Sequence, residues 1–165
     1  MEILEQVSEF HRLFQHPILT NPQIPNEQRC ALRKSLLQEE LAELCEAIDK
    51  KDIVGVADAL CDLQYVLAGA VLEFGMKDAF PKMFAEVQRS NMSKACDTEQ
   101  EAKDTIQFYQ NDQADRKKRL QLPDPIDEMH YEERGGKFFV YRTHDMKTLK
   151  SINYSPADLK KILSL

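Results

Sequence analysis

Hydrophobic side chains recur at helical spacing through the N-terminal half of the chain. Residues 2–15 carry apolar side chains at intervals of three and four, which predicts a first helix with one apolar face. Three prolines between residues 16 and 26 interrupt this pattern and predict a loop. The pattern then resumes, and we expect a second helix that runs from an N-cap at Asn26 to Asp49. Its apolar stripe consists of Leu37, Leu41, Leu44 and Ile48.

Two further helices are predicted from the same periodicity. One runs from Asp52 to Phe74, and Gly75 directly after it is a typical helix stop. The other runs from Lys77 to Met92. Four helices joined by short links favour an antiparallel four-helix bundle, so the predicted fold class is mainly α.

The polar and hydrophobic pattern changes after residue 96. It predicts a short solvated helix over residues 98–112 and a charged, proline-bearing linker over residues 114–125. Two strands in residues 129–142, with a Gly-Gly pair between them, predict a β-hairpin. A last helical turn is expected to begin at Ser155 with Pro156 in its first position.

The length of 165 residues fits one main core. We therefore expect residues 1–96 to form a helical catalytic bundle and residues 97–165 to form a small α+β appendage packed on the same domain. The net charge of −6 argues against binding to polymeric nucleic acid. Four cysteines without a CxxC motif or zinc-type spacing predict reduced, mostly buried thiols.

Two features bear on the cellular compartment. The acidic N-terminal sequence lacks a basic region followed by an apolar one, so we expect a cytoplasmic protein. Residues 53–72 are apolar and long enough to raise the question of a membrane span. Two aspartates and a glutamine near the middle of this segment make insertion costly, which favours a helix buried in a protein core and no membrane partner.

The second predicted helix is rich in glutamates. At 100° per residue, Glu39, Glu43 and Glu46 share a sector opposite the apolar stripe, and Glu40 lies on its flank. A solvated acidic face and a set of metal ligands explain this helix equally well. Like charges one turn apart repel, however, and no Lys or Arg lies between Lys34 and Lys50 to offset them.

The third predicted helix favours the metal. Asp58 and Asp62 lie one turn apart in apolar sequence, and buried carboxylates are paired with cations or bound to metal. An antiparallel hairpin would let these aspartates face the glutamates, and a set of oxygen ligands suits Mg²⁺ or Mn²⁺. A di-iron bundle would need two Glu-x-x-His motifs, which the chain lacks. Surface or packing roles are expected for His11, His16, His130 and His144.

Three ordered motifs resemble the all-α nucleoside triphosphate pyrophosphohydrolases, the MazG-like and phosphoribosyl-ATP-pyrophosphohydrolase-like proteins. They are EELAE at 39–43, DALCDLQYVLAGAVLEFG at 58–75 and RSNMSK at 89–94. With EFHRLF near the N-terminus the resemblance covers about residues 8–94, and the closing LKSINYSPADL is similar to the tail of one branch. The sequence departs from the superfamily pattern at Ala59, where a Glu is usual and Asp58 would replace it, and at Gln88, where related sequences often have His.

The resemblance implies Mg²⁺-dependent cleavage between the α and β phosphates, which yields a nucleoside monophosphate and pyrophosphate. Glu39 or Glu40 would orient the attacking water, and a homodimer or a dimer of dimers is implied. The implied metal ligands are Glu39, Glu40, Glu43, Asp58 and Asp62. The implied substrate-binding residues are Arg89, Asn91 and Lys94, although a polar helix C-terminus explains these three residues as well.

Nucleotide-pool clean-up is therefore the leading functional hypothesis. A phosphoribosyl-ATP pyrophosphohydrolase of histidine synthesis is the alternative enzyme, and a non-catalytic metal-binding helical module is the alternative from another class. Phe10, His11 and Phe14 could border the base, but phenylalanines one turn apart are more typical of a core.

Overall fold

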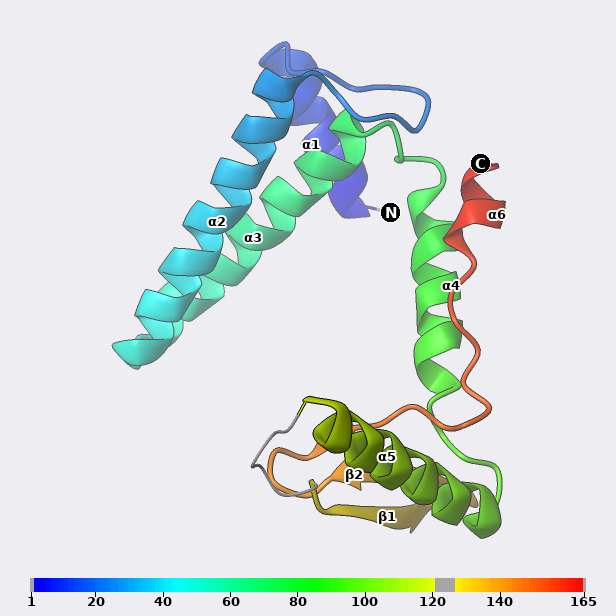
Figure 1. The fold of residues 1–165 in the computed structure, drawn as a ribbon. Coiled ribbons are helices and arrows are strands. Elements are labelled where there is room, and N and C mark those ends of the chain that lie inside the picture. The colour runs from blue at the N-terminus through cyan, green and yellow to red at the C-terminus, as the bar shows by residue number, and fades with distance from the viewer. Residues whose placement is uncertain (1, 121–126, 165) are drawn as a thin grey trace. The chain divides into compact units, whose positions relative to one another are not determined.

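The computed structural model describes residues 2–120 and 127–164 and divides into two compact units (Figure 1). The first unit comprises Met1–Met83 with Ile162–Leu165, and the second comprises Phe84–Lys161. Helices dominate the first unit, whereas the second combines a helix with a small sheet. The chain is thus mainly helical, as predicted, with a small C-terminal α+β part.

The first unit is built around a helical hairpin. Helix α2 (Glu27–Asp49) and helix α3 (Ile53–Glu73) run antiparallel across a three-residue turn, and α1 (Glu2–Leu13) packs against α3 (Figure 1). The small apolar core between α1 and α3 consists of Val7, Ala68 and Leu72, with Leu4 and Ile18 against them.

Local side-chain chemistry sets the ends of these helices, and the predicted ends are confirmed. The Asn26 side chain accepts a hydrogen bond from the backbone N–H of Arg29 at 2.9 Å and caps α2. Asp52 caps α3 in the same way. Gly75 ends α3 with a φ of +70°, and a Cβ there would lie 2.0 Å from the carbonyl oxygen of Asn21, so only glycine fits.

Helix α4 (Phe80–Met92) begins three residues later than the predicted start at Lys77. Pro81 lies in its first turn, where the missing N–H needs no helical partner. The predicted four-helix bundle is not confirmed. Within the described residues of the first unit, α1, α2 and α3 are the three helices that lie there over their full length, and α4 continues into the second unit.

The second unit packs one helix on an antiparallel sheet. Helix α5 (Glu99–Leu120) contacts strands β1 (Met129–Arg134) and β2 (Lys137–Arg142), and β3 (Lys147–Thr148) pairs with the other edge of β2 (Figure 1). The hairpin prediction is confirmed, because Gly135 and Gly136 form a two-residue turn with positive φ at both positions. The core here consists of Cys96, Ala102 and Val140, with Ile106, Tyr131, Phe138 and Leu149 around them.

Two sequence predictions for this part of the chain are wrong. Residues 114–120 continue α5 instead of forming a linker, because no Gly or Pro interrupts the helix formers there; residues 121–125 of the predicted linker lie outside the described residues. The last helix, α6 (Leu159–Leu163), starts after Asp158 and not at Ser155. The Asp158 side chain accepts a hydrogen bond from the backbone N–H of Lys161 at 3.1 Å, which makes it the N-cap.

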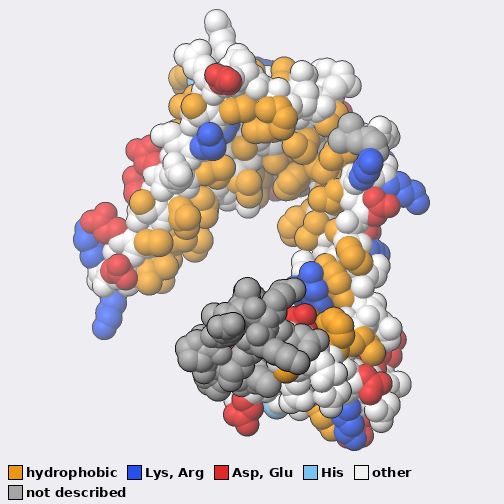
Figure 2. All heavy atoms as spheres, viewed as in Figure 1, with side chains coloured by type: hydrophobic (Ala, Val, Ile, Leu, Met, Phe, Trp, Pro, Cys, Tyr) orange, Lys and Arg blue, Asp and Glu red, His pale blue; other side chains and the backbone are white. Residues whose placement is uncertain are grey.

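The apolar helix α3 is only partly covered. Its buried side chains lie mostly between Ala68 and Glu73, whereas Ile53 and Val54 are about three-quarters exposed. Hydrophobic side chains gather along the α2 and α3 hairpin (Figure 2). The expectation of a helix buried along its whole length is therefore wrong for this single chain. Among the described helices, α3 alone has the length and composition to cross a membrane, criteria that core helices of soluble proteins also meet.

The four cysteines are free thiols. Cys96 is buried in the core of the second unit and Cys30 is partly buried, whereas Cys45 and Cys61 are exposed on the helical hairpin. The prediction of mostly buried thiols is therefore wrong for Cys45 and Cys61, because the faces of α2 and α3 that carry them are uncovered in one chain.

Candidate functional site

The five predicted metal ligands all lie on the helical hairpin of the first unit. Glu40 is half-buried and shares the α3-facing side of α2 with the buried residues Arg33 and Ala47, which lie two turns before and after it. The sequence analysis placed Glu40 on the flank of the sector that holds Glu39, Glu43 and Glu46, and the structure adds that this flank faces α3. We use the name acid cluster for Glu39, Glu40, Glu43, Asp58 and Asp62.

Electrostatics shows that these carboxylates affect one another. Burial raises the pKa of Glu40, and the nearby carboxylates of Asp62, Glu43, Glu39 and Asp58 raise it further. In the described part of the chain, no member of the acid cluster makes a side-chain hydrogen bond or an ion pair. The hairpin therefore concentrates carboxylates that form no ion pair with a cation in the described part of the chain.

The two aspartates are exposed, which corrects the expectation that α3 withdraws them from water. Like charges keep flexible side chains apart, and in the described residues no three His, Cys, Asp or Glu side chains lie close enough together to hold a metal ion. A divalent cation would offset this repulsion, and the ligands available to it would all be carboxylate oxygens.

A shallow hollow of about 270 Å³ joins the two helices near their turn. Glu43 and Asp58 both line it, and so does Ala59, which is buried against α2 at the position where the superfamily usually has Glu. Asp58, one residue earlier, reaches the same hollow with a carboxylate. This placement supports Asp58 as the replacement for that missing Glu.

The other two acids of this hollow have partners. Glu46 forms an ion pair with Lys50 one turn later, and this hydrogen bond lowers the pKa of Glu46. Asp52 accepts hydrogen bonds from the backbone N–H groups of Val54 and Gly55 as the cap of α3. The side chains of Glu46 and Asp52 thus have hydrogen-bond partners, whereas the five side chains of the acid cluster have none among the described residues.

One buried acid escaped the sequence analysis. Glu73 is fully buried at the end of α3 and forms ion pairs with Arg29 and Arg33 of α2, the first through a 3.0 Å bond from Arg29 Nε to Glu73 Oε2. Burial alone would raise the pKa of Glu73, but the hydrogen bonds from both arginines outweigh it and lower the pKa. The arginines lie one turn apart on α2, and only the tertiary fold shows which acid they meet.

His11 belongs to the same buried network. Its Nδ1 lies 3.0 Å from the carbonyl oxygen of Pro17, and burial lowers the pKa of the imidazole, which favours the neutral form at pH 7. Arg33 Nε is the one buried side-chain nitrogen or oxygen in the described residues that lacks a hydrogen-bond partner. The predicted packing role of His11 fits this environment, whereas Phe10 and Phe14 stack on each other and stay partly exposed.

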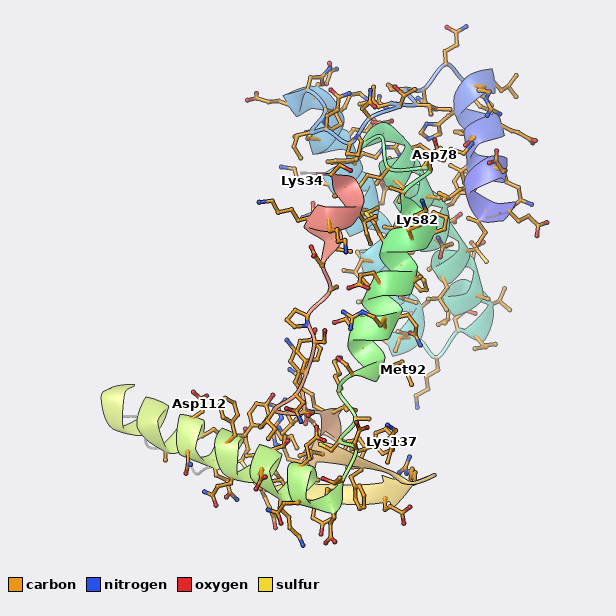
Figure 3. All side chains as sticks on the ribbon, turned by 90° about the vertical axis from the view of Figure 1, so that its right-hand side faces the viewer. Lys34, Asp78, Lys82, Met92, Asp112 and Lys137 are labelled. Carbon is orange, nitrogen blue, oxygen red and sulfur yellow. The ribbon has the colours of Figure 1, made fainter. Side chains whose placement is uncertain are left out.

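The predicted substrate-binding residues lie in the second unit, at and just after the end of α4. Arg89 is occupied, because its guanidinium donates to both carboxylate oxygens of Glu86 at 2.8 Å. The side chains of Asn91 and Lys94 make no hydrogen bond or ion pair with any described residue. Figure 3 shows Met92, between them, at the end of α4. Asn91 and Lys94 are thus available for a ligand in a way that Arg89 is not.

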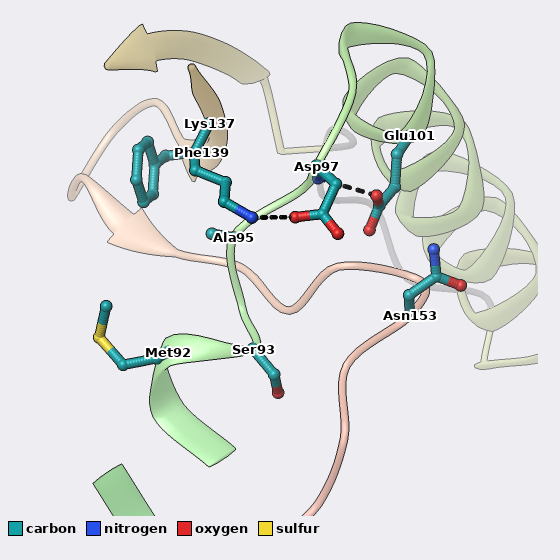
Figure 4. A pocket seen from close by; sticks show the side chains of 8 residues that line it. All are labelled: Met92, Ser93, Ala95, Asp97, Glu101, Lys137, Phe139 and Asn153. Carbon is teal, nitrogen blue, oxygen red and sulfur yellow. Dashed lines mark hydrogen bonds and ion pairs between the residues drawn. The ribbon is translucent and has the colours of Figure 1, made fainter. Parts of the chain in front are cut away.

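A cavity of about 370 Å³ lies beyond this segment (Figure 4). Its charged groups mostly bind one another: Lys137 pairs with Asp97, whose backbone N–H donates to Glu101 at 2.9 Å. The lining residues come from four distant parts of the sequence, which explains why no sequence motif indicated this cavity. They are Met92, Ser93, Ala95, Asp97, Glu101, Lys137, Phe139 and Asn153.

Comparison with known proteins identifies the helical part. A family model described as phosphoribosyl-ATP pyrophosphohydrolase matches residues 7–91, just over half of the chain. The chain belongs to this family. The family is part of the all-α nucleoside triphosphate pyrophosphohydrolase superfamily, so the resemblance inferred from the motifs is confirmed. The matched residues include the whole acid cluster, and the family indicates a pyrophosphohydrolase that acts on nucleotides.

A curated relative shares this region. An uncharacterized protein of Acanthamoeba polyphaga mimivirus is 36% identical over 76 residues. The match covers 44% of this chain and 30% of the viral protein, so the chain spans less than a third of the length of this relative.

Proposed function

We propose that the protein hydrolyses a nucleoside triphosphate to the monophosphate and pyrophosphate in a Mg²⁺-dependent reaction that removes unwanted nucleotides. The observation that carries the proposal is the acid cluster. In a member of a pyrophosphohydrolase family, five carboxylates form no ion pair with any described residue, and burial together with the other four raises the pKa of Glu40. A purely structural cluster would be expected to include cations, as the Glu73 network of the same hairpin does.

The donor set fits a hard divalent cation. Glu39, Glu40, Glu43, Asp58 and Asp62 offer only carboxylate oxygens, the ligands that suit Mg²⁺ or Mn²⁺. When bound, such an ion polarises phosphoryl oxygens and neutralises charge on the pyrophosphate leaving group. These five residues would hold the ion, and the hollow beside Glu43 and Asp58 leaves room for phosphate oxygens.

Other side chains would activate the attacking water and bind the substrate. Glu39 or Glu40, whichever is less engaged by the cation, would accept a proton from the attacking water. Asn91 and Lys94 would donate hydrogen bonds to phosphate and sugar oxygens, and their freedom from other partners supports this role. Arg89 was predicted with them, but its bonds to Glu86 favour a different role for this side chain.

A nucleotide panel tests the proposal. Standard and non-standard nucleoside triphosphates, and phosphoribosyl-ATP, would be incubated with the protein and Mg²⁺ and assayed for released pyrophosphate. We expect release from at least one triphosphate and almost none from the Asp62→Asn variant. Turnover of phosphoribosyl-ATP alone would indicate the histidine-synthesis enzyme. Binding of Mg²⁺ without turnover of any nucleotide would overturn the proposal in favour of a non-catalytic module.

We also propose that the protein assembles as a homodimer or a dimer of dimers. The apolar side chains that the single chain leaves exposed on α2 and α3 support assembly, because a surface of this kind is normally covered by protein. They include Leu41, Ile48, Ile53, Val54 and Leu60. Light scattering at micromolar concentration should report a multiple of the 19.1 kDa chain mass, and a monomer would contradict this proposal.

A further inference from the structure

The C-terminal tail, which we define as residues 150–158, is bound to the end of α4 through side-chain hydroxyls. The buried Ser90 hydroxyl forms a 2.8 Å hydrogen bond with the Tyr154 hydroxyl. Ser93 Oγ accepts a hydrogen bond from the backbone N–H of Ser155 at 3.0 Å, and its hydroxyl donates to the Ser90 carbonyl at 2.8 Å, with the Ser155 carbonyl at 3.3 Å. Each contact joins residues that are more than sixty positions apart in sequence, so the tail is a tertiary partner of this segment.

Charged groups extend these contacts along the helix. The Arg89 guanidinium donates to the Ser155 hydroxyl and to the Pro156 carbonyl, both at 3.0 Å. Its partner Glu86 accepts a hydrogen bond from the backbone N–H of Asp158 at 3.0 Å. The Arg89 hydrogen bonds and this backbone N–H lower the pKa of Glu86 to about 2, so the carboxylate stays ionised throughout the physiological range.

Lys94 also contacts the tail, through its backbone carbonyl. The backbone N–H of Ser151 donates to the Lys94 carbonyl at 3.3 Å, and the Lys94 N–H donates to the Asn91 carbonyl at 3.2 Å. Residues 89, 90 and 93 are therefore tied to the tail through their side chains, and residue 94 through its carbonyl. Within the described residues, the side chains of Asn91 and Lys94 remain free of hydrogen bonds and ion pairs.

We propose that the tail is a clamp that holds the end of α4 in the shape needed for nucleotide binding, with Tyr154, Ser90 and Arg89 as positioning residues for Asn91 and Lys94. This inference rests on the proposed function, because it takes Asn91 and Lys94 as the groups that contact the nucleotide. It assigns Arg89 to the clamp instead of to the substrate. A fixed backbone at residues 89–94 lowers the entropy lost when the two free side chains engage phosphate or sugar oxygens.

A pair of matched tyrosine variants tests the clamp. Tyr154→Phe removes the hydroxyl that binds Ser90 and keeps the ring. Tyr109→Phe removes another hydroxyl that anchors the same tail, since Tyr109 Oη accepts from the Lys150 N–H at 3.2 Å, but that anchor lies on α5. With the nucleotide that the parent hydrolyses, we expect Tyr154→Phe to raise KM by about three- to tenfold, the equivalent of one neutral hydrogen bond, with kcat within about twofold. Tyr109→Phe should leave KM unchanged.

Double variants distinguish a positioning role of Tyr154 from a general effect of its substitution on stability. Ser90→Ala removes the other half of the same bond, so the double variant with Tyr154→Phe should be no worse than either single variant. Asn91→Ala removes one of the two positioned substrate contacts, so Tyr154→Phe should raise KM by less in this variant than in the parent. Equal KM changes in both tyrosine variants, or fully additive changes with Asn91→Ala, would overturn the clamp.

Hydrogen exchange tests the clamp without turnover. Amides of residues 89–94 should exchange faster in nucleotide-free Tyr154→Phe than in the parent, and Tyr109→Phe should match the parent. Unchanged exchange in Tyr154→Phe would overturn the clamp even if the enzyme is active. Faster exchange in a protein that hydrolyses no nucleotide would instead overturn the proposed function and leave the clamp as a structural contact only, without the role proposed for it.

Discussion

The helical hairpin carries two groups of carboxylates with opposite surroundings. At the end of α3 where α1 packs, Glu73 is fully buried and shares two arginines of α2. Further along the same helices, the five residues of the acid cluster form no ion pair with any described residue, and burial together with the other four carboxylates raises the pKa of Glu40. The same two helices thus hold a buried acid that the protein neutralises and five acids that form no ion pair with any described residue.

The difference indicates what each group is for. A buried carboxylate without a partner would cost several kcal/mol, so the arginines beside Glu73 are a condition of folding. Exposed carboxylates that repel cost only a few tenths of a kcal/mol per pair, a cost that the fold tolerates. We interpret Glu73 as structural and the acid cluster as functional, and the following predictions test that division from the largest expected effect to the smallest.

Loss of the buried acid should give the largest loss of stability. Glu73→Gln leaves Arg29 and Arg33 close together without a counter-charge, and breaking a buried ion pair in this way typically costs about 3–5 kcal/mol. Urea unfolding in EDTA measures the change. Asp62→Asn on the same helix is the matched control, and it should leave the metal-free protein at least as stable as the parent. Equal destabilisation by the two variants would contradict the division between the groups.

Loss of an unpaired acid should instead remove activity. We expect Asp62→Asn or Glu43→Gln to lower kcat/KM by about 100-fold or more, equivalent to roughly 2.7 kcal/mol of transition-state stabilisation. The control is Glu46→Gln, because Glu46 lies on the same helix but is paired with Lys50. Steady-state kinetics with saturating Mg²⁺ should show near-parental activity for this control. An equally inactive Glu46→Gln would mean that pairing does not distinguish functional acids from structural ones.

A methyl group added at Gly69, beside the buried network of Glu73, Arg33 and His11, should destabilise the protein, although Gly→Ala in a helix usually stabilises it. A Cβ at residue 69 would lie 2.5 Å from Arg33 Nη1 and 3.1 Å from His11 Nε2, so the guanidinium would have to move away from Glu73. We expect Gly69→Ala to lower the free energy of unfolding by about 1–3 kcal/mol. Gly55→Ala near the acid cluster, where the closest atoms lie at 3.0 to 3.2 Å, should change it less. Thermal unfolding of both variants compares the two positions, and equal changes would count against a rigid network around Glu73.

The smallest effect concerns the pH dependence of the metal-free protein. The pKa of Glu40 is raised in the folded state, so its contribution to stability is fully present below the ordinary glutamate pKa and is lost as the pH rises through the raised value. Glu40→Gln removes that loss and should be more stable than the parent at pH 7 in EDTA by a few tenths of a kcal/mol, about the size of like-charge repulsion on a helix. Denaturation at pH 4 and pH 7 measures the difference, and a variant less stable than the parent at pH 7 would contradict the repulsion.

The sequence predicts the features that depend on neighbouring residues. The cap at Asn26, the stop at Gly75 and the turn at Gly135 and Gly136 all follow from side-chain chemistry within a few positions. The antiparallel hairpin that carries the five residues of the acid cluster was also predicted, whereas their role as metal ligands stays a prediction.

Features that depend on tertiary contacts were missed or misjudged. Glu73 meets arginines forty or more positions away, and nothing near it in sequence indicates them. The apolar composition of α3 shows that the helix must pack against other protein, but it does not show which of its residues are packed. Asp58 and Asp62 were therefore wrongly expected to be buried. The tail contacts to Ser90 and Ser93 join residues more than sixty positions apart, which spacing within a motif cannot show.

The position of bond cleavage tests the central claim, that the acid cluster supports hydrolysis between the α and β phosphates, most directly. The reaction would be run in ¹⁸O-labelled water with excess Mg²⁺ and the best nucleoside triphosphate of the panel, and the products analysed by mass spectrometry. Attack of water on the α-phosphorus places the label in the nucleoside monophosphate and releases unlabelled pyrophosphate, the result we predict. Label in orthophosphate, with a nucleoside diphosphate as the other product, would contradict the account, because the acid cluster would then serve hydrolysis of the γ-phosphate.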